Sequence, residues 1–141
     1  MRFNMDEHIK AVQSHAGENW GVAANAGAEI DTKGWDEALV IVNAGTATGT
    51  NTVTVTECTS SGGSFSAISG AAFTAITSAN DDAIYVGRIK LQGANPARAR
   101  YIKVLATVTV DVCDFGIVVL LGKAENLPIS QAATVVFSVR T

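Results

Sequence analysis

The chain has few charged and few aromatic residues, and both shortages exclude classes of function. Of its 141 residues, 16% are charged and 6% are aromatic, and the formal net charge is -3. Proteins that bind nucleic acid through its phosphates need a clustered basic surface, which this charge balance argues against. Apolar runs stay well below the ~20 residues that a membrane-spanning helix requires. We therefore expect neither nucleic acid nor a membrane among its partners.

Cysteine and proline are scarce too, with two residues of each. Cys58 and Cys113 lie far apart without CxxC spacing, which favours free thiols in a reducing cytosol over a disulfide. The first residues, MRFNMDEHIK, carry acidic side chains where a secretory signal needs an apolar stretch. This pattern predicts that the protein is not exported by the Sec pathway.

The sequence also lacks a visible catalytic or metal-binding constellation. His8 and His15 have no third ligand beside them and make a poor metal site. Asp81 and Asp82 are adjacent, so they point apart in a turn and supply too few oxygen ligands for calcium. The run AGTATGTN lacks the Lys-Ser/Thr pair that completes a phosphate-binding loop. We expect a protein that is not an enzyme and has no catalytic residue, no cofactor and no metal.

The most informative stretch that is present runs from Tyr101 to Gly122. Its first half alternates apolar and polar residues, with Leu105 as the apolar exception, and this two-residue period is typical of a half-buried strand. Phe115 to Leu121 is apolar on both faces, which predicts a central strand that is covered on both sides. The two halves are expected to fold back on each other through Asp111 to Asp114.

Short strand patterns recur along the rest of the chain, separated by turn residues. Almost no helical periodicity is visible, and Val and Thr, which favour strands, are abundant. This spacing predicts an all-β protein, an antiparallel β-sandwich, and the long loops at 44–51 and 92–99 favour a jelly roll. The further strands are expected at 37–43, 52–57, 83–91 and 134–139.

Residues 1–34 differ from the remainder and are interpreted as an N-terminal arm outside a sandwich domain of residues 35–141. Met5, Ile9 and Val12 fall at helical spacing, and the following segment is rich in Ala, Gly and Asn. An equally supported alternative makes this region the first strand and long loops of the same domain, with the strand near Gly21 to Ile30.

Two groups of residues are candidates for contact with a partner protein. Scattered apolar anchors in the arm form the first group, and a modest basic cluster around one loop and two strands forms the second. Core burial of the tryptophan and simple solvation of the basic cluster remain alternatives. The first group is Met5, Ile9, Val12 and Trp20, and the second is Arg88, Lys90, Arg98 and Arg100 with Lys103 beside them.

Several segments resemble a group of small tailed-bacteriophage virion proteins. They are IDTKGWDEALVIVNAGTATGTNTVTVTE, SGGSFSAISGAAFTAI, ARYIKVLATVTV and the late strand that ends in VLLGKAENLPI. The resemblance covers roughly residues 30–129. It implies a head decoration, or cement, protein that is made in the host cytoplasm, lies on the outer capsid surface and binds the major capsid protein.

Alternative functions stay open beside this resemblance. One is a tail or head-to-tail connector subunit, and another is a carbohydrate-binding jelly roll of a virion spike, although Tyr85 and Tyr101 are the only tyrosines. The apolar runs FGIVVLL and ALVIV exceed what one small sandwich needs to cover itself. They predict a homodimer or homotrimer.

Overall fold

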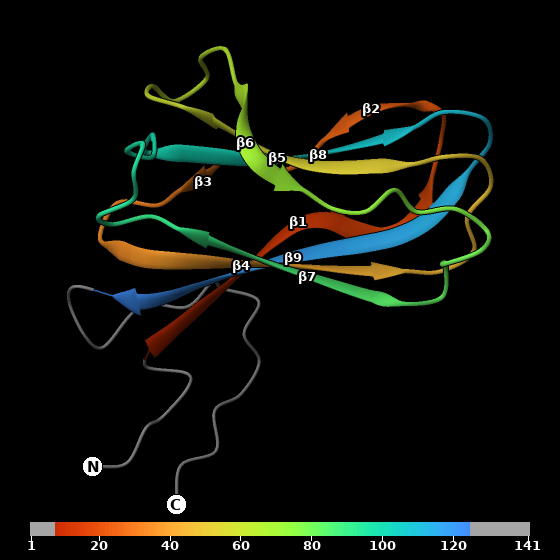
Figure 1. The fold of residues 1–141 in the computed structure, drawn as a ribbon, viewed down its shortest axis with the longest axis horizontal. Helices are drawn as coiled ribbons and strands as arrows, with labels where there is room; N and C mark the ends of the chain where they lie inside the picture. Colours follow the sequence, from red (N-terminus) through yellow and green to blue (C-terminus); the bar gives the residue numbers. More distant parts are fainter. Residues whose placement is uncertain (1–7, 125–141) are drawn as a thin grey trace, which may run out of the picture.

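The computed structural model describes residues 8–124, and in that range the chain forms nine β-strands (Figure 1). Within the same range no helix is long and apolar enough to cross a membrane. In chain order the strands are β1 (Ile9–Trp20), β2 (Ala23–Ala26), β3 (Ile30–Asp31), β4 (Trp35–Ala44), β5 (Thr52–Cys58), β6 (Ser66–Ala72), β7 (Ile84–Lys90), β8 (Tyr101–Val108) and β9 (Cys113–Ala124).

The strands form two facing antiparallel sheets. Sheet A has the order β1-β9-β4-β7, and sheet B has the order β2-β8-β5-β6, with β3 also paired to β8. Because β2 and β3 pair with successive parts of β8, they act as one interrupted strand. Successive strands then alternate between the sheets, except for the hairpin of β5 and β6 within sheet B, and this is the strand order of a jelly roll. The predicted all-β sandwich of jelly-roll type is confirmed.

The core lies between the sheets and follows from strand alternation. In β4 every second residue from Ala38 to Ala44 is buried, and in β8 every second residue from Ile102 to Val108 is buried. Side chains of alternate residues leave a strand on opposite faces, so each sheet turns one apolar face inward. Burying a Val, Leu, Ile or Phe side chain contributes about 1.5–3 kcal/mol to stability. Both cysteines are free thiols, as predicted.

Strand β9 is central, as the apolar run from Phe115 to Leu121 predicts. It pairs with β1 on one side and with β4 on the other. The inner residues Phe115, Ile117, Val119 and Leu121 are buried. On the outer face Val118 is 38% exposed, so the described residues cover that side incompletely. The sequence predicts that both faces of β9 are covered. Within residues 8–124, only the inner face is fully covered.

The interpretation of residues 1–34 as an outer arm is wrong for residues 9–31. Ile9–Trp20 is the edge strand of sheet A along β9, and residues 23–31 pair with β8. The alternative strand near Gly21 to Ile30 is partly right, because β2 lies inside it. The predicted strand at 134–139 lies outside the described residues.

Bulges explain why β1 does not look like a strand in the sequence. Its pairing with β9 shifts between Gln13 and His15 and again between His15 and Glu18. Ser14 and His15 consequently both face inward and are buried, although they are consecutive. Gly17 lies against Gly116, where a built Cβ would be 3.0 Å from the Gly17 Cα atom. Pairing with the apolar β9 thus overrides the weak helical spacing of Ile9 and Val12.

Candidate interaction surfaces

The structure places the predicted apolar anchors within the sandwich instead of on an arm. Met5 lies outside the described residues. Ile9 begins β1, and Val12 packs against the core from the same strand. The Trp20 ring stacks on Phe115 with 5.5 Å between ring centroids, and its Nε1–H donates to the carbonyl oxygens of Ala16 and Phe115 at 3.1 and 3.2 Å. Trp20 therefore fixes the last residue of β1 against β9.

The predicted basic residues lie at one end of the molecule, and most of them have acidic neighbours. Arg88 contacts Glu37 at 2.6 Å, and Arg98 lies 3.6 Å from Glu57. Arg100 donates to both carboxylate oxygens of Asp31, at 2.8 and 2.7 Å. This pairing holds the pKa of Asp31 below its usual value. Lys103 instead stands over the Phe65 ring, and Lys90 forms no ion pair with any residue from 8 to 124.

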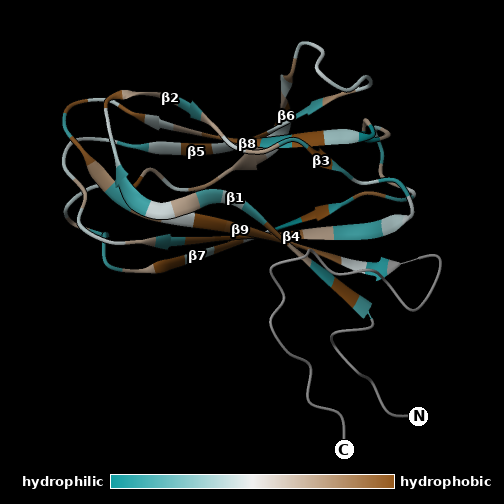
Figure 2. Ribbon diagram, turned by 180° about the vertical axis from the view of Figure 1, so that it is seen from behind, coloured by the Kyte–Doolittle hydropathy of each residue, from teal (hydrophilic) through white to brown (hydrophobic). Residues whose placement is uncertain are grey.

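The outer face of sheet A carries an apolar patch that spans three strands. Cross-strand register places Val118, Ile41 and Val86 side by side, with Leu120 beside Leu39 in the next row. Val86 is 58% exposed and Ile84, farther along β7, is 66% exposed. Figure 2 shows hydrophobic colour along β9 and β7. Contiguous exposed apolar surface of this kind is a candidate interaction site.

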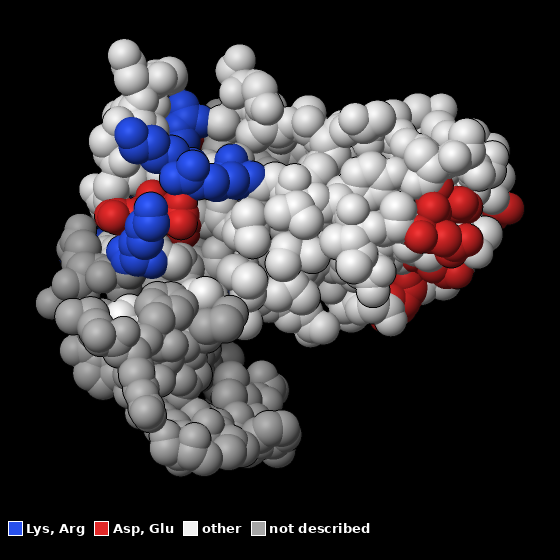
Figure 3. All heavy atoms as spheres, turned by 60° about the horizontal axis from the view of Figure 1, so that its bottom comes forward, with Lys and Arg blue, Asp and Glu red and all other residues white. Residues whose placement is uncertain are grey.

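Charges of opposite sign lie beyond the two ends of this patch. Arg88, Lys90 and Lys123 stand at one end, where Glu37 contacts Arg88 and Lys123. At the other end, the residues that line one hollow include Glu18, Asp82 and Asp114 and no Lys or Arg. Figure 3 shows basic groups with acidic atoms among them at one end, acidic groups alone at the other end, and an uncharged band between the two. The outer face thus runs from basic through apolar to acidic.

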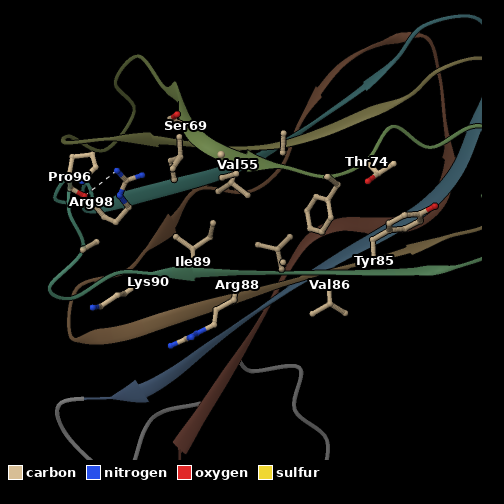
Figure 4. A pocket seen from close by; sticks show the side chains of 18 of the residues that line it. Val55, Ser69, Thr74, Tyr85, Val86, Arg88, Ile89, Lys90, Pro96 and Arg98 are labelled. Atoms are coloured by element: carbon tan, nitrogen blue, oxygen red, sulfur yellow. Dashed lines mark hydrogen bonds between the residues drawn. The ribbon is translucent and has the colours of Figure 1, made fainter.

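A second surface is the groove along the open side of the sandwich, between the edge strands β6 and β7. Its volume is about 590 Å³. Ile89 and Val55 point into it from opposite sheets, while Val86 and Arg88 leave β7 on the other side (Figure 4). Phe73 lies over Gly87, where a built Cβ would be 2.9 Å from the ring. Arg98 belongs to the lining, whereas the Lys90 side chain leaves β7 at the rim, on the same side as Arg88. The groove therefore has an apolar interior, with Arg98 in its wall and Lys90 at its rim.

Sequence reasoning found part of these surfaces. It identified the apolar excess of ALVIV and FGIVVLL, which supply Leu39, Ile41, Val118 and Leu120 to the outer face. It missed Ile84 and Val86 as exposed residues, because an alternating strand does not reveal which face the second sheet covers. The acidic end was also missed, since Glu18, Asp82 and Asp114 are distant in sequence.

Comparison with known proteins gives no family for this chain. No family model and no curated protein matches it. Among solved structures, the fold is similar to a chain described under "Bacillus endospore appendages form a novel family of disulfide-linked pili". The identity is 16%, the match covers 88% of this chain and 97% of that chain, and the TM-score is 0.45.

This comparison corrects the predicted function. The similar chain comes from a bacterial appendage and not from a phage head, which contradicts the prediction of a capsid decoration protein. We therefore do not retain that function. The capsid partner and the location on the virion were implied by the resemblance alone and are not carried further. The match assigns no function of its own to this chain.

Proposed function

We propose that the chain is a non-catalytic structural subunit that associates with a second copy of itself through the outer face of sheet A. The observation that carries the proposal is the order of groups along this face. An apolar centre formed by β4, β7 and β9 separates a basic end from an acidic end. A surface with this order is complementary to itself when one copy is reversed.

The order of charges selects one two-fold arrangement. If the axis lies in the plane of the face and crosses the strands near Val86, the basic end of each copy meets the acidic end of the other. Val86 then packs on Val86 of the second copy, and Lys90 approaches Asp82 of the second copy. An axis parallel to the strands would place like charges together, which costs affinity. Apolar burial at the centre supplies the attraction, and the charges set the orientation.

The test measures the association state of full-length protein by sedimentation velocity over a range of concentrations. We expect a dimer, and Val86→Glu should weaken it at least roughly tenfold, because two carboxylates would be buried face to face. Val110→Glu is the matched control, since Val110 is 66% exposed and lies in the loop between β8 and β9. A wild-type protein that stays monomeric, or an equal loss in both variants, would refute the proposal.

A further inference from the structure

The four edges of the sandwich differ in how well they are protected against pairing with another strand. Strand β1 has two register shifts, and β2 and β3 are short. Strand β6 has a register shift against β5, and Gly70 within it has a φ of 81°. Strand β7 pairs with β4 in unbroken register from Ile84 to Lys90. Bulges and short strands are the usual means of blocking edge pairing, so β7 is the unprotected edge.

Hydrogen bonds at the two ends of β7 show which of its backbone groups are free. The Leu91 N–H donates to the Asp36 carbonyl oxygen at 2.8 Å, and the Ala44 N–H donates to the Ala83 carbonyl oxygen at 2.9 Å. In an antiparallel pair, hydrogen-bonded residues alternate with residues whose backbone groups point away. Tyr85, Gly87 and Ile89 therefore bond to β4. Residues 84, 86, 88 and 90 direct their N–H and C=O groups to the open edge.

A strand added beside β7 would also place side chains in the groove. Its alternate residues would face either the outer side of sheet A or the space between β7 and β6. That space is lined by apolar side chains that include Val55, Ile68, Phe73 and Ile89. Unpaired backbone groups therefore lie next to an apolar groove of about 590 Å³. This combination suits a peptide better than a compact small molecule, because a peptide satisfies the backbone groups too.

We propose that the β7 edge and its groove bind an extended peptide segment of a partner protein, with alternating apolar side chains and a carboxylate opposite Lys90. The carboxylate follows from Lys90, whose side chain leaves β7 on the outer side of sheet A, next to the open edge, and has no ion pair within residues 8–124. Pairing of β7 with β7 of a second copy is the competing occupant. Such pairing of two copies would place a whole second sandwich beside the β7 edge. It would not insert the side chains of a peptide into the groove.

The test uses full-length protein and a synthetic peptide as long as β7, which alternates valine with threonine and carries a terminal aspartate. Binding is measured by fluorescence anisotropy. Val86→Pro removes an N–H that points to the open edge and not to β4, a position where edge strands accept proline. We expect it to weaken binding at least roughly tenfold, because a backbone hydrogen bond is lost and the proline ring obstructs the edge. Val86→Thr keeps the N–H, so it should weaken binding much less than Val86→Pro.

A second measurement keeps the test decisive if the proline variant does not fold. The peptide is N-methylated on alternate residues, in two versions that differ by one position. One version blocks the N–H groups that face β7 and should not bind, while the other should bind like the parent peptide. Equal binding of both versions would overturn the proposal. So would slow hydrogen exchange at the Val86 and Arg88 amides without peptide, because the edge would then already be paired within the chain or with a second copy.

Discussion

His15 illustrates how a single buried polar residue ties the two sheets together. Its side chain is 2% exposed and lies 5.1 Å from Trp20 and 5.6 Å from Phe115 between ring centroids. The Nε2–H donates to the Asn25 carbonyl oxygen in β2 at 2.9 Å, and Nδ1 lies 3.0 Å from the Ser14 hydroxyl. With Nε2 protonated, Nδ1 accepts from Ser14, and the neutral ring satisfies both nitrogens. Both ring nitrogens of His15 thus have partners within the protein, and the residue links sheet A to sheet B.

We predict that the fold loses stability as the pH falls below about 6.5, in part because of His15. Burial lowers the pKa of His15 from its ordinary value of 6.5 and outweighs the opposing effect of the bond to Asn25. Below that pH the unfolded chain binds more protons than the folded chain, so the free energy of unfolding decreases. The loss reaches at most about 1.4 kcal/mol per pH unit.

Urea denaturation at pH 7.5 and 5.5 measures this effect, with His15→Gln as the comparison. Glutamine offers a donor and an acceptor but does not titrate, so the variant should be less stable at pH 7.5 and change less between the two values. The pKa values of Glu29 and Asp31 are lowered from 4.5 and 3.8, so these groups titrate below the window. An equal pH dependence in both proteins would show that His15 is not the responsible group.

Strand β1 makes the N-terminal region a part of the folded sandwich and not an arm outside it. Its inner side chains cover the core, and its backbone pairs with β9 from Ile9 to Trp20. Without β1, the free edge of β9 would be exposed along with much of the surface of Phe115 and Ile117. The free energy of unfolding of a small domain is only about 5–15 kcal/mol. The stabilising free energy that is lost with a long strand exceeds this value.

We predict that a chain beginning at Thr32 does not fold cooperatively. Circular dichroism and thermal unfolding should show no two-state transition, because both β1 and the β2–β3 strand are missing. A chain beginning at His8 keeps every described strand and serves as the control, which should unfold in one cooperative transition. Cooperative unfolding of the shorter chain would mean that β1 contributes little to the core.

Strands could be predicted from the sequence where apolar residues alternate or run continuously. This holds for β4, β5, β7, β8 and β9, whose side chains pack in regular register. Strand β1 could not be predicted, because its bulges turn Ser14 and His15 inward together and remove the two-residue period. Of the candidate residues, Arg98 lies in the groove wall and Arg88 and Lys90 leave β7 on the outer face of sheet A, whereas Trp20 packs at the end of β1. The bulges of β1 and the positions of these side chains depend on contacts between distant segments, which the local sequence does not encode.

At the scale of the molecule, the proposed dimer depends on charges at opposite ends of sheet A. Asp82 lies two residues before β7 and Lys90 is the last residue of that strand, and Lys90 has no ion pair within residues 8–124. In the two-fold arrangement around Val86, each Lys90 faces Asp82 of the other copy. Because the interface contains this pair twice, each single change alters two contacts.

We predict that Asp82→Lys and Lys90→Asp each weaken the dimer by roughly three- to tenfold, and that the double variant recovers most of the affinity. Each single variant places like charges together, whereas the double variant restores opposite charges with reversed polarity. Sedimentation velocity at low and moderate salt gives the dissociation constants.

Since Asp82 has a φ of 50°, which asparagine also tolerates, Asp82→Asn serves as a control that removes the charge without straining the backbone. It should weaken the dimer less than Asp82→Lys. If the losses of the two single variants simply add in the double variant, Lys90 does not face Asp82, and the axis near Val86 is wrong even if sheet A is the contact surface.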